Sequence, residues 1–87
     1  MSMTEGASIP RPLSVLPVGG QGIVHSLNGG RDFCSRVANL GFTAGAAITV
    51  VQNYGRGPML VSLRGTLVAL GRTEAGNVVV RATDGNG

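Results

Sequence analysis

The chain has 87 residues, with seven basic residues against four acidic ones and a formal net charge of +3. A chain of this length builds one domain with one small core, which leaves little room for an enzyme cleft and the shell that supports it. Its longest apolar run, "AGAAITVV", is far shorter than the ~18–20 residues of a membrane-spanning helix. We therefore expect a binding or accessory module, not an enzyme and not a membrane-inserted protein.

All seven basic residues are arginines, and this excess raises the question of nucleic-acid binding. A nucleic-acid interface normally combines a cluster of basic side chains with aromatic rings on which bases stack. The arginines here are spread along the chain, and only 3% of the residues are aromatic. We expect no nucleic-acid partner.

The N-terminal stretch "MSMTEGASIPRPLS" contains no apolar segment of the kind that a secretory signal needs. We expect residues 1–10 to form a flexible lead. The single cysteine, Cys34, excludes an internal disulfide and fits a reducing compartment. These features predict a cytoplasmic protein.

A first strand is predicted at residues 21–28, "QGIVHSLN", after a proline-rich stretch. We expect Ile23 and one neighbour to face the core, with His25 on the same side as Ile23. The sequence "NGG" then ends the strand. Three apolar residues of the proline-rich stretch can also pack against the core: Leu13, Val15 and Leu16.

An amphipathic helix is predicted at residues 31–40, "RDFCSRVANL". Its apolar stripe consists of three residues at helical spacing: Phe33, Val37 and Leu40. Gly41 follows directly and can adopt the left-handed conformation that ends many helices. Phe42 is then placed to fold back onto the last helical turn.

Four more strands are predicted after a second tight turn at Gly45. They are "AITVVQN", "MLVSLRG", "TLVAL" and "VVVRA". The stretch "YGRGP" at 54–58 is a hairpin loop, and "RG" at 64–65 is a tight turn. The stretch "GRTEAGN" at 71–77 forms a turn or a single helical turn, with Thr73 as its cap.

Five short strands in so small a chain cannot build a two-layered sandwich, but they can curl into a barrel. We therefore predict a mainly β fold: a small, partly open barrel of about five strands, with one amphipathic helix as a plug and a short helical turn. The two tight turns at Gly41 and Gly45 bring the helix and the next strand back against one core.

Three motifs of the sequence resemble, in order and spacing, the FeoA family of small SH3-like barrels. They are L-G-F-x-x-G at 40–45, G-P at 57–58 and A-L-G-R-x-E-A at 69–75. The resemblance implies an SH3-like domain, which we place at residues 11–82, with a flexible tail at 83–87. The family more often has larger side chains at Gly71 and Gly76, which puts the rigidity of the short helical turn in question but not the fold.

The resemblance also implies a function. It suggests a small cytosolic accessory protein of bacterial ferrous iron uptake that binds and modulates the FeoB permease, which carries a GTP-binding domain. The same SH3-like domain occurs at the C-terminus of iron-dependent repressors, so a free-standing regulatory domain is an alternative. A divalent-metal-binding oligomer is another alternative, and the sequence leaves the oligomeric state open, a weak homo-oligomer included.

Four residues of the chain are candidate ligands for a transition metal: His25, Asp32, Cys34 and Glu74. They do not form a metal-binding spacing such as C-x-x-C or H-x-x-x-H. His25 also lacks the third group that would orient it as the base of a nucleophilic site. We expect no metal site within one copy, no catalytic residue and no cofactor, although two copies could pool these ligands.

Partner binding is expected at the helix cap and at the loop that contains Tyr54. The predicted surface consists of Arg36, Leu40, Phe42, Tyr54 and Arg72. Leu40 and Phe42 are either buried staples of the helix cap or an exposed apolar patch beside Arg36. The arginines and Tyr54 are either partner contacts or ordinary solvated side chains.

Overall fold

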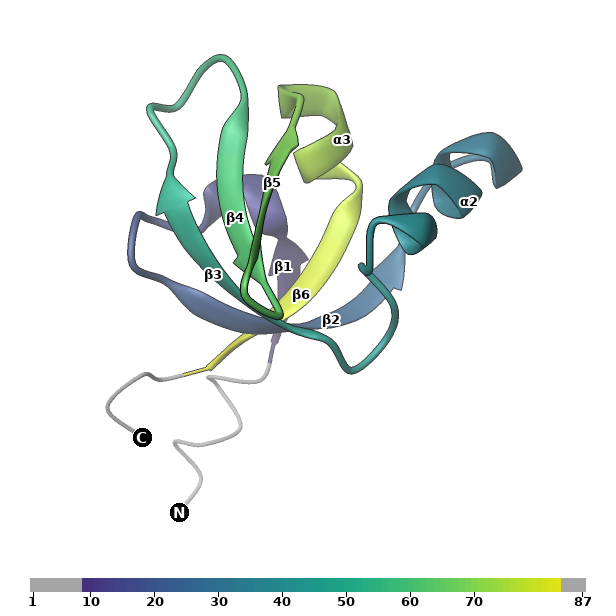
Figure 1. Cartoon of the computed structure of the whole chain (residues 1–87), viewed down its shortest axis with the longest axis horizontal. Helices are drawn as coiled ribbons and strands as arrows, with labels where there is room; N and C mark the ends of the chain where they lie inside the picture. Colours follow the sequence, from purple (N-terminus) through teal and green to yellow (C-terminus); the bar gives the residue numbers. More distant parts are fainter. Residues whose placement is uncertain (1–8, 84–87) are drawn as a thin grey trace.

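A computed structural model describes residues 9–83 of the chain, and Figure 1 shows its arrangement. Six strands form one curved antiparallel sheet in the order β1-β6-β2-β3-β4-β5. The strands are β1 (Pro10–Pro12), β2 (Gln21–Leu27), β3 (Ala47–Gln52), β4 (Met59–Leu63), β5 (Thr66–Leu70) and β6 (Val78–Thr83). The helices are the 3-10 turn η1 (Leu13–Val15), α2 (Arg31–Asn39) and α3 (Arg72–Gly76). The predicted mainly β, partly open barrel with one amphipathic helix and a short helical turn is confirmed.

The ends of the barrel differ in what they carry. Figure 1 shows α3 and the β3–β4 loop at one end, and the β4–β5 turn at the other. The predicted flexible lead falls mainly on residues 1–8 and the predicted tail on residues 84–87, which lie outside the described residues. The predicted limits of the SH3-like domain, between residues 10 and 11 and between residues 82 and 83, stay predictions. None of the helices within residues 9–83 is long and apolar enough to cross a membrane.

The core forms because each strand turns alternate side chains inward. In β4, Met59, Val61 and Leu63 are buried, while Leu60 and Ser62 are only half-buried. The other strands, the helices and the segments between them supply the rest of the cluster: Ile48, Val50, Val68, Leu70, Val78, Val80, Leu13, Leu16, Val24, Val37, Phe42, Ala46 and Ala75. No charged or polar side chain of the described residues is fully buried.

Helix α2 ends as the sequence predicts. The Gly41 N–H donates to the carbonyl of Ala38 at 2.9 Å, and the Phe42 N–H donates to that of Val37 at 3.2 Å. These two bonds, with Gly41 at φ +111°, form a Schellman-type C-cap. A Cβ at position 41 would stand 2.7 Å from Cδ2 of Leu63, so any other residue would force this buried side chain of β4 to shift. Phe42 is thereby turned into the core, with 0% exposure.

Strand β2 corrects one expectation about which side chains face the core. Val24 is buried, Ile23 is only half-buried and His25 is exposed. The pairing of β2 with β6 shifts by one residue between Val24 and Ser26, which is a bulge at His25. Ile23 and Val24 both precede this bulge, and both are apolar, so the pattern of β2 alone could not decide which of the two faces the core.

The first strand and the two short helical segments also differ from expectation. Strand β1 and η1 were not predicted, and Val15 of η1 is 57% exposed instead of packed. Helix α3 begins after Gly71 and not after Thr73, since Glu74 caps it by accepting a hydrogen bond from the Gly71 N–H. This is the glutamate half of a capping box, and glycine cannot supply the other half.

Candidate partner-binding surface

The β3–β4 loop, residues 53–58, is tied to η1 by the side chain of Asn53. Its Nδ2 donates to the carbonyl of Leu16 at 2.8 Å and to that of Ser14 at 3.2 Å. Its Oδ1 accepts a hydrogen bond from the Gly55 N–H at 3.0 Å. One half-buried amide therefore satisfies two backbone carbonyls and closes the first turn of the loop.

Arg72 braces the same loop from α3. Its Nη2 donates to Oδ1 of Asn53 at 2.8 Å, and its Nη1 lies 3.4 Å from the carbonyl of Ser14. Its Nε is buried and finds no hydrogen-bond partner among residues 9–83. The structure thus gives Arg72 an internal, bracing contact, and its predicted role in partner binding stays a prediction.

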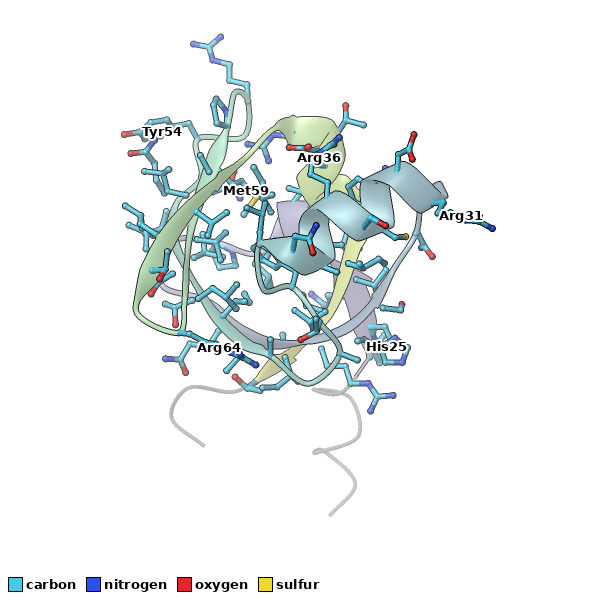
Figure 2. All side chains as sticks on the ribbon, turned by 45° about the vertical axis from the view of Figure 1, so that its right-hand side comes forward. His25, Arg31, Arg36, Tyr54, Met59 and Arg64 are labelled. Atoms are coloured by element: carbon cyan, nitrogen blue, oxygen red, sulfur yellow. The ribbon has the colours of Figure 1, made fainter. Side chains whose placement is uncertain are left out.

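Tyr54 stands at the tip of this braced loop and is 75% exposed. Gly55 and Gly57 follow it with φ of +86° and +73°, which lets the chain turn sharply below the ring. Figure 2 shows Tyr54 and Arg36 toward the same end of the barrel, whereas His25 and Arg64 lie at the other end. The loop holds a large aromatic side chain in solvent by means of specific hydrogen bonds.

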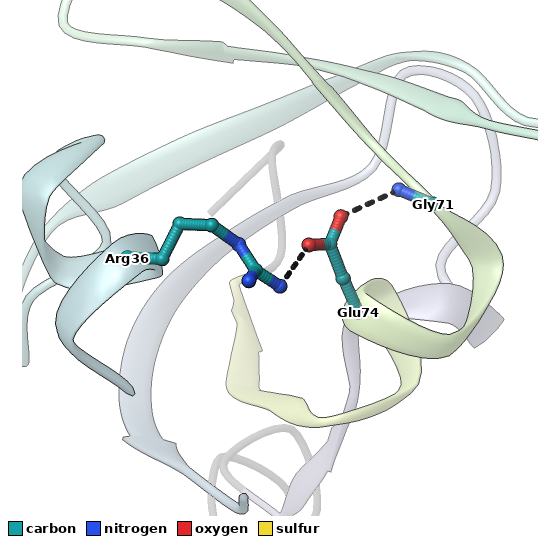
Figure 3. A network of polar contacts seen from close by, with 3 residues as sticks. All are labelled: Arg36, Gly71 and Glu74. Carbon is teal, nitrogen blue, oxygen red and sulfur yellow. Dashed lines mark hydrogen bonds and ion pairs between the residues drawn. The ribbon is translucent and has the colours of Figure 1, made fainter. Parts of the chain in front are cut away.

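Arg36 joins α2 to α3 through an ion pair with Glu74 (Figure 3). The distance from Nη2 of Arg36 to Oε2 of Glu74 is 2.5 Å. The other oxygen of Glu74 accepts the Gly71 N–H at 3.0 Å. The backbone hydrogen bond from Gly71, and then the hydrogen bond and charge of Arg36, lower the pKa of Glu74. The Arg36 side chain remains 58% exposed, so it can still meet a partner.

Leu40 and Phe42 have different surroundings. Leu40 is 45% exposed and lies one helical turn beyond Arg36, on the same face of α2. Phe42 is fully buried in the core, because the Schellman-type cap turns it inward. Its side chain therefore does not belong to a binding surface, which corrects the inclusion of Phe42 in the predicted set. The core interpretation holds for Phe42, and Leu40 remains a surface residue.

The comparison with known families settles the relationship of the chain. The family model described as the FeoA domain matches residues 11–82. The chain belongs to the FeoA family. Its three sequence motifs at 40–45, 57–58 and 69–75 all lie within this match.

Relatives of this FeoA domain include a curated archaeal protein. The putative Fe(2+) transport protein A of Methanocaldococcus jannaschii is 28% identical over 76 residues, which cover 87% of this chain and 92% of that protein. Among solved structures, an iron uptake regulatory protein, FeoA, is 35% identical with a TM-score of 0.82, over 86% of this chain and all of that one.

Two further structures bear on the fold and on metals. Stenotrophomonas maltophilia FeoA, an SH3 domain protein solved in complex with zinc, is 32% identical with a TM-score of 0.72, over 82% of this chain and 93% of that one. A manganese-dependent transcriptional repressor is 19% identical with a TM-score of 0.80, over 87% of this chain and 43% of the repressor. The latter likeness shows a shared SH3-like fold.

The candidate metal ligands of this FeoA domain are dispersed. Nδ1 of His25 lies 3.2 Å from Oγ of Ser26, and Sγ of Cys34 donates weakly to the carbonyl of Gly29 at 3.6 Å. Glu74 is engaged with Arg36, and Asp32 lies in the first turn of α2. Within residues 9–83, no three His, Cys, Asp or Glu side chains gather into a group that could hold a metal ion.

The bracing network was missed by sequence reasoning. Its members, Ser14, Asn53 and Arg72, lie 19 to 58 residues apart along the chain. Only the asparagine before the glycine-rich loop carried a local signal, since Asn commonly bonds to the backbone two residues on. The A-L-G-R-x-E-A motif also contains Arg72 and Glu74, and the structure now gives both residues a contact.

Proposed function

We propose that this FeoA-family chain is a non-enzymatic accessory protein of ferrous iron uptake. In this proposal it acts in the cytoplasm, where it docks onto the GTP-binding part of the FeoB permease and modulates it. Family membership over residues 11–82 supports an iron-uptake role, as does the likeness to an archaeal protein named for Fe(2+) transport. The small size of the domain, with one core, agrees with a binding module.

Tyr54 is the observation that carries the docking proposal. Tyrosine and arginine are among the residues that most often dominate binding energy in protein interfaces. Here a 75% exposed tyrosine stands on a loop that Asn53 and Arg72 brace, so binding would not have to order the loop first. We define the docking surface as Arg36, Leu40 and Tyr54, with Arg72 as its brace.

The docking surface can modulate FeoB only through a difference in affinity. A ligand shifts a conformational equilibrium of its partner only as far as it binds one state more tightly than the other. We therefore expect the affinity for the FeoB cytosolic domain to change with the bound nucleotide. Binding of the chain would then favour one nucleotide state of FeoB over the other.

The test is a titration of ¹⁵N-labelled chain with the FeoB cytosolic domain, with GTP and without nucleotide, followed by amide NMR. We expect shifts to cluster on the docking surface. Tyr54→Ala and Arg36→Ala should each weaken binding about tenfold or more, the range of interface hot spots. Arg31→Ala is the matched control, since it removes the same charge from the same helix at a site away from Tyr54 (Figure 2).

Two results would contradict the proposal. One is the absence of binding to the FeoB domain in either nucleotide state. The other is equal loss of affinity in Arg31→Ala and Arg36→Ala, which would show that net charge and not the docking surface drives association. Because Tyr54 and Arg36 are exposed, circular dichroism should show both variants folded, with unfolding free energies within about 1 kcal/mol of the wild type.

Binding of a divalent metal between copies is a second candidate function. The complex of Stenotrophomonas maltophilia FeoA with zinc favours it. Since the ligands of one copy are dispersed, the site would require His25, Cys34 or a carboxylate from two copies. Calorimetry with zinc and with ferrous iron under reducing conditions tests it, and the absence of binding heat with both ions would reject it.

A further inference from the structure

The sheet has two outer strands, β1 and β5, and they differ in chemistry. An outer strand exposes backbone N–H and C=O groups that can pair with another chain, and proteins usually block such edges with proline or charge. Strand β1 reads Pro10-Arg11-Pro12, so it carries two residues without an N–H and one charge. Strand β5 reads "TLVAL", with neither proline nor charge. One edge is blocked and the other is open to pairing.

The turn that precedes β5 determines which backbone groups of the strand bond to β4 and which are left free. Arg64 and Gly65 both have positive φ, +53° and +81°, as a two-residue hairpin turn of type I′ requires. Leu63 and Thr66 are paired directly beside this turn, and Val61 pairs with Val68. In an antiparallel hairpin of this length these are the hydrogen-bonded pairs, and every second residue of β5 instead points its backbone groups away from β4.

Leu67 and Ala69 are the residues of β5 whose backbone N–H and C=O groups point away from β4. Both side chains are exposed, and Leu67 is 59% exposed. Among residues 9–83, β5 is paired only with β4, and no turn or loop donates to or accepts from Leu67 or Ala69. Figure 1 shows β5 at the front of the barrel. Four backbone groups and an apolar side chain are thus presented to solvent together.

We propose that β5 pairs antiparallel with β5 of a second copy, so that the two sheets join across a two-fold axis at Val68. In this register Leu67 lies opposite Ala69 of the second copy, and each of these pairs exchanges two hydrogen bonds. All four free groups of each edge are then used. Registers centred on Leu67 or Ala69 would set two leucines or two alanines opposite each other and would use residues of the flanking turns.

The sequence of β5 suits a second copy for two reasons. A two-fold axis places each residue opposite a fixed partner, so any charge in the strand could meet a like charge, and β5 has none. A large side chain, Leu67, faces a small one, Ala69, on the outer surface, next to the half-buried Leu60 of β4. The contact is short, so we expect a weak dimer, with a dissociation constant in the micromolar to millimolar range.

The test uses the full chain in sedimentation equilibrium over a range of concentrations, with a chelator and a reductant present. These additions exclude dimers bridged by metal or by Cys34. Leu67→Lys places a charge on the open edge and should weaken dimerisation at least tenfold. Val18→Lys is the matched control, because Val18 is equally exposed, at 59%, but lies in the turn before β2. It should dimerise as the wild type does.

Amide hydrogen exchange checks the register independently of the variants. The amides of Thr66, Val68 and Leu70 bond to β4 and should be protected at every concentration. Those of Leu67 and Ala69 should become protected only as the dimer forms. A chain that stays monomeric up to millimolar concentration overturns the proposal. So does a dimer that leaves these two amides unprotected, or one that Leu67→Lys and Val18→Lys affect equally.

Discussion

Replacing Gly41 by alanine tests why the helix cap is built as it is. Two costs add at this position. Alanine at φ +111° costs about 1–2 kcal/mol, since its Cβ crowds the backbone in left-handed conformations. The new Cβ would also stand 2.7 Å from Cδ2 of the buried Leu63, and overpacking of a core typically costs about 1–3 kcal/mol. We expect Gly41→Ala to lower the free energy of unfolding by about 2–5 kcal/mol.

Gly45 provides the control that separates the two costs. Its φ is +93°, but a Cβ there would meet no atom within 4 Å. Gly45→Ala should therefore cost only about 1–2 kcal/mol, the backbone term alone. The double variant Gly41→Ala/Leu63→Val removes the crowding atom, so its loss should be smaller than the sum of the two single losses by about 1 kcal/mol or more.

The assay is urea unfolding followed by circular dichroism, which gives the free energy of unfolding for each variant. A difference of less than about 0.5 kcal/mol between Gly41→Ala and Gly45→Ala would refute the contact with Leu63. Full additivity in the double variant would refute it as well. A Gly41→Ala protein as stable as the wild type would refute the account of the cap altogether.

Three further predictions concern the network and α3. Arg72→Ala and Asn53→Ala should each lower the unfolding free energy by about 1–3 kcal/mol. The double variant should lose less than the sum of the two single losses, because the two side chains share one hydrogen bond. Additive losses in urea unfolding would contradict the network. Glu74→Gln should lose about 1 kcal/mol at pH 7, since the ion pair with Arg36 is partly exposed. Folding lowers the pKa of Glu74 from 4.5. The difference in unfolding free energy between the wild type and Glu74→Gln should therefore be complete above about pH 4.5 and vanish as the pH falls through the folded pKa. A difference that persists at acid pH would be contrary evidence. Gly76→Ala should raise the midpoint of urea unfolding and stabilise the protein by about 0.4–1 kcal/mol. Gly76 lies in α3, and the new Cβ would stand 3.8 Å from Oγ of Ser14, which is an ordinary contact distance. A loss of stability would show that α3 needs the glycine.

The parts of the fold that depend on local sequence were predictable. Helix α2 followed from its apolar spacing, and its end followed from Gly41, because a C-cap is formed by residues that are neighbours in the chain. The turn at 64–65 and the alternation in β4 were predictable for the same reason. The buried position of Phe42 was one of two open alternatives, and the geometry of the cap decided between them.

The parts that depend on distant partners were not predictable. Strand β1 reads as an irregular segment because of its prolines, and only its pairing with β6 makes it a strand. The burial of Val24 and not Ile23 depends on which face of β2 the sheet turns toward the core, because two adjacent apolar residues leave that choice open. In the candidate site, Tyr54 and Arg36 could be named from their residue types, but the bracing of the loop by Arg72 requires that α3 fold back over η1.

The position of the domain's two ends has a consequence for how such folds are used in larger chains. The described chain enters the sheet at β1 and leaves it at β6, and these strands are neighbours, with Pro10 opposite Arg81. The start of β1 and the end of β6 therefore lie side by side, at the end of the barrel opposite α3 and the β3–β4 loop (Figure 1). A unit with this geometry can be joined to other domains through either connection without covering its far end. The same fold occupies part of a longer manganese-dependent repressor, which is the arrangement that such adjacent connections permit.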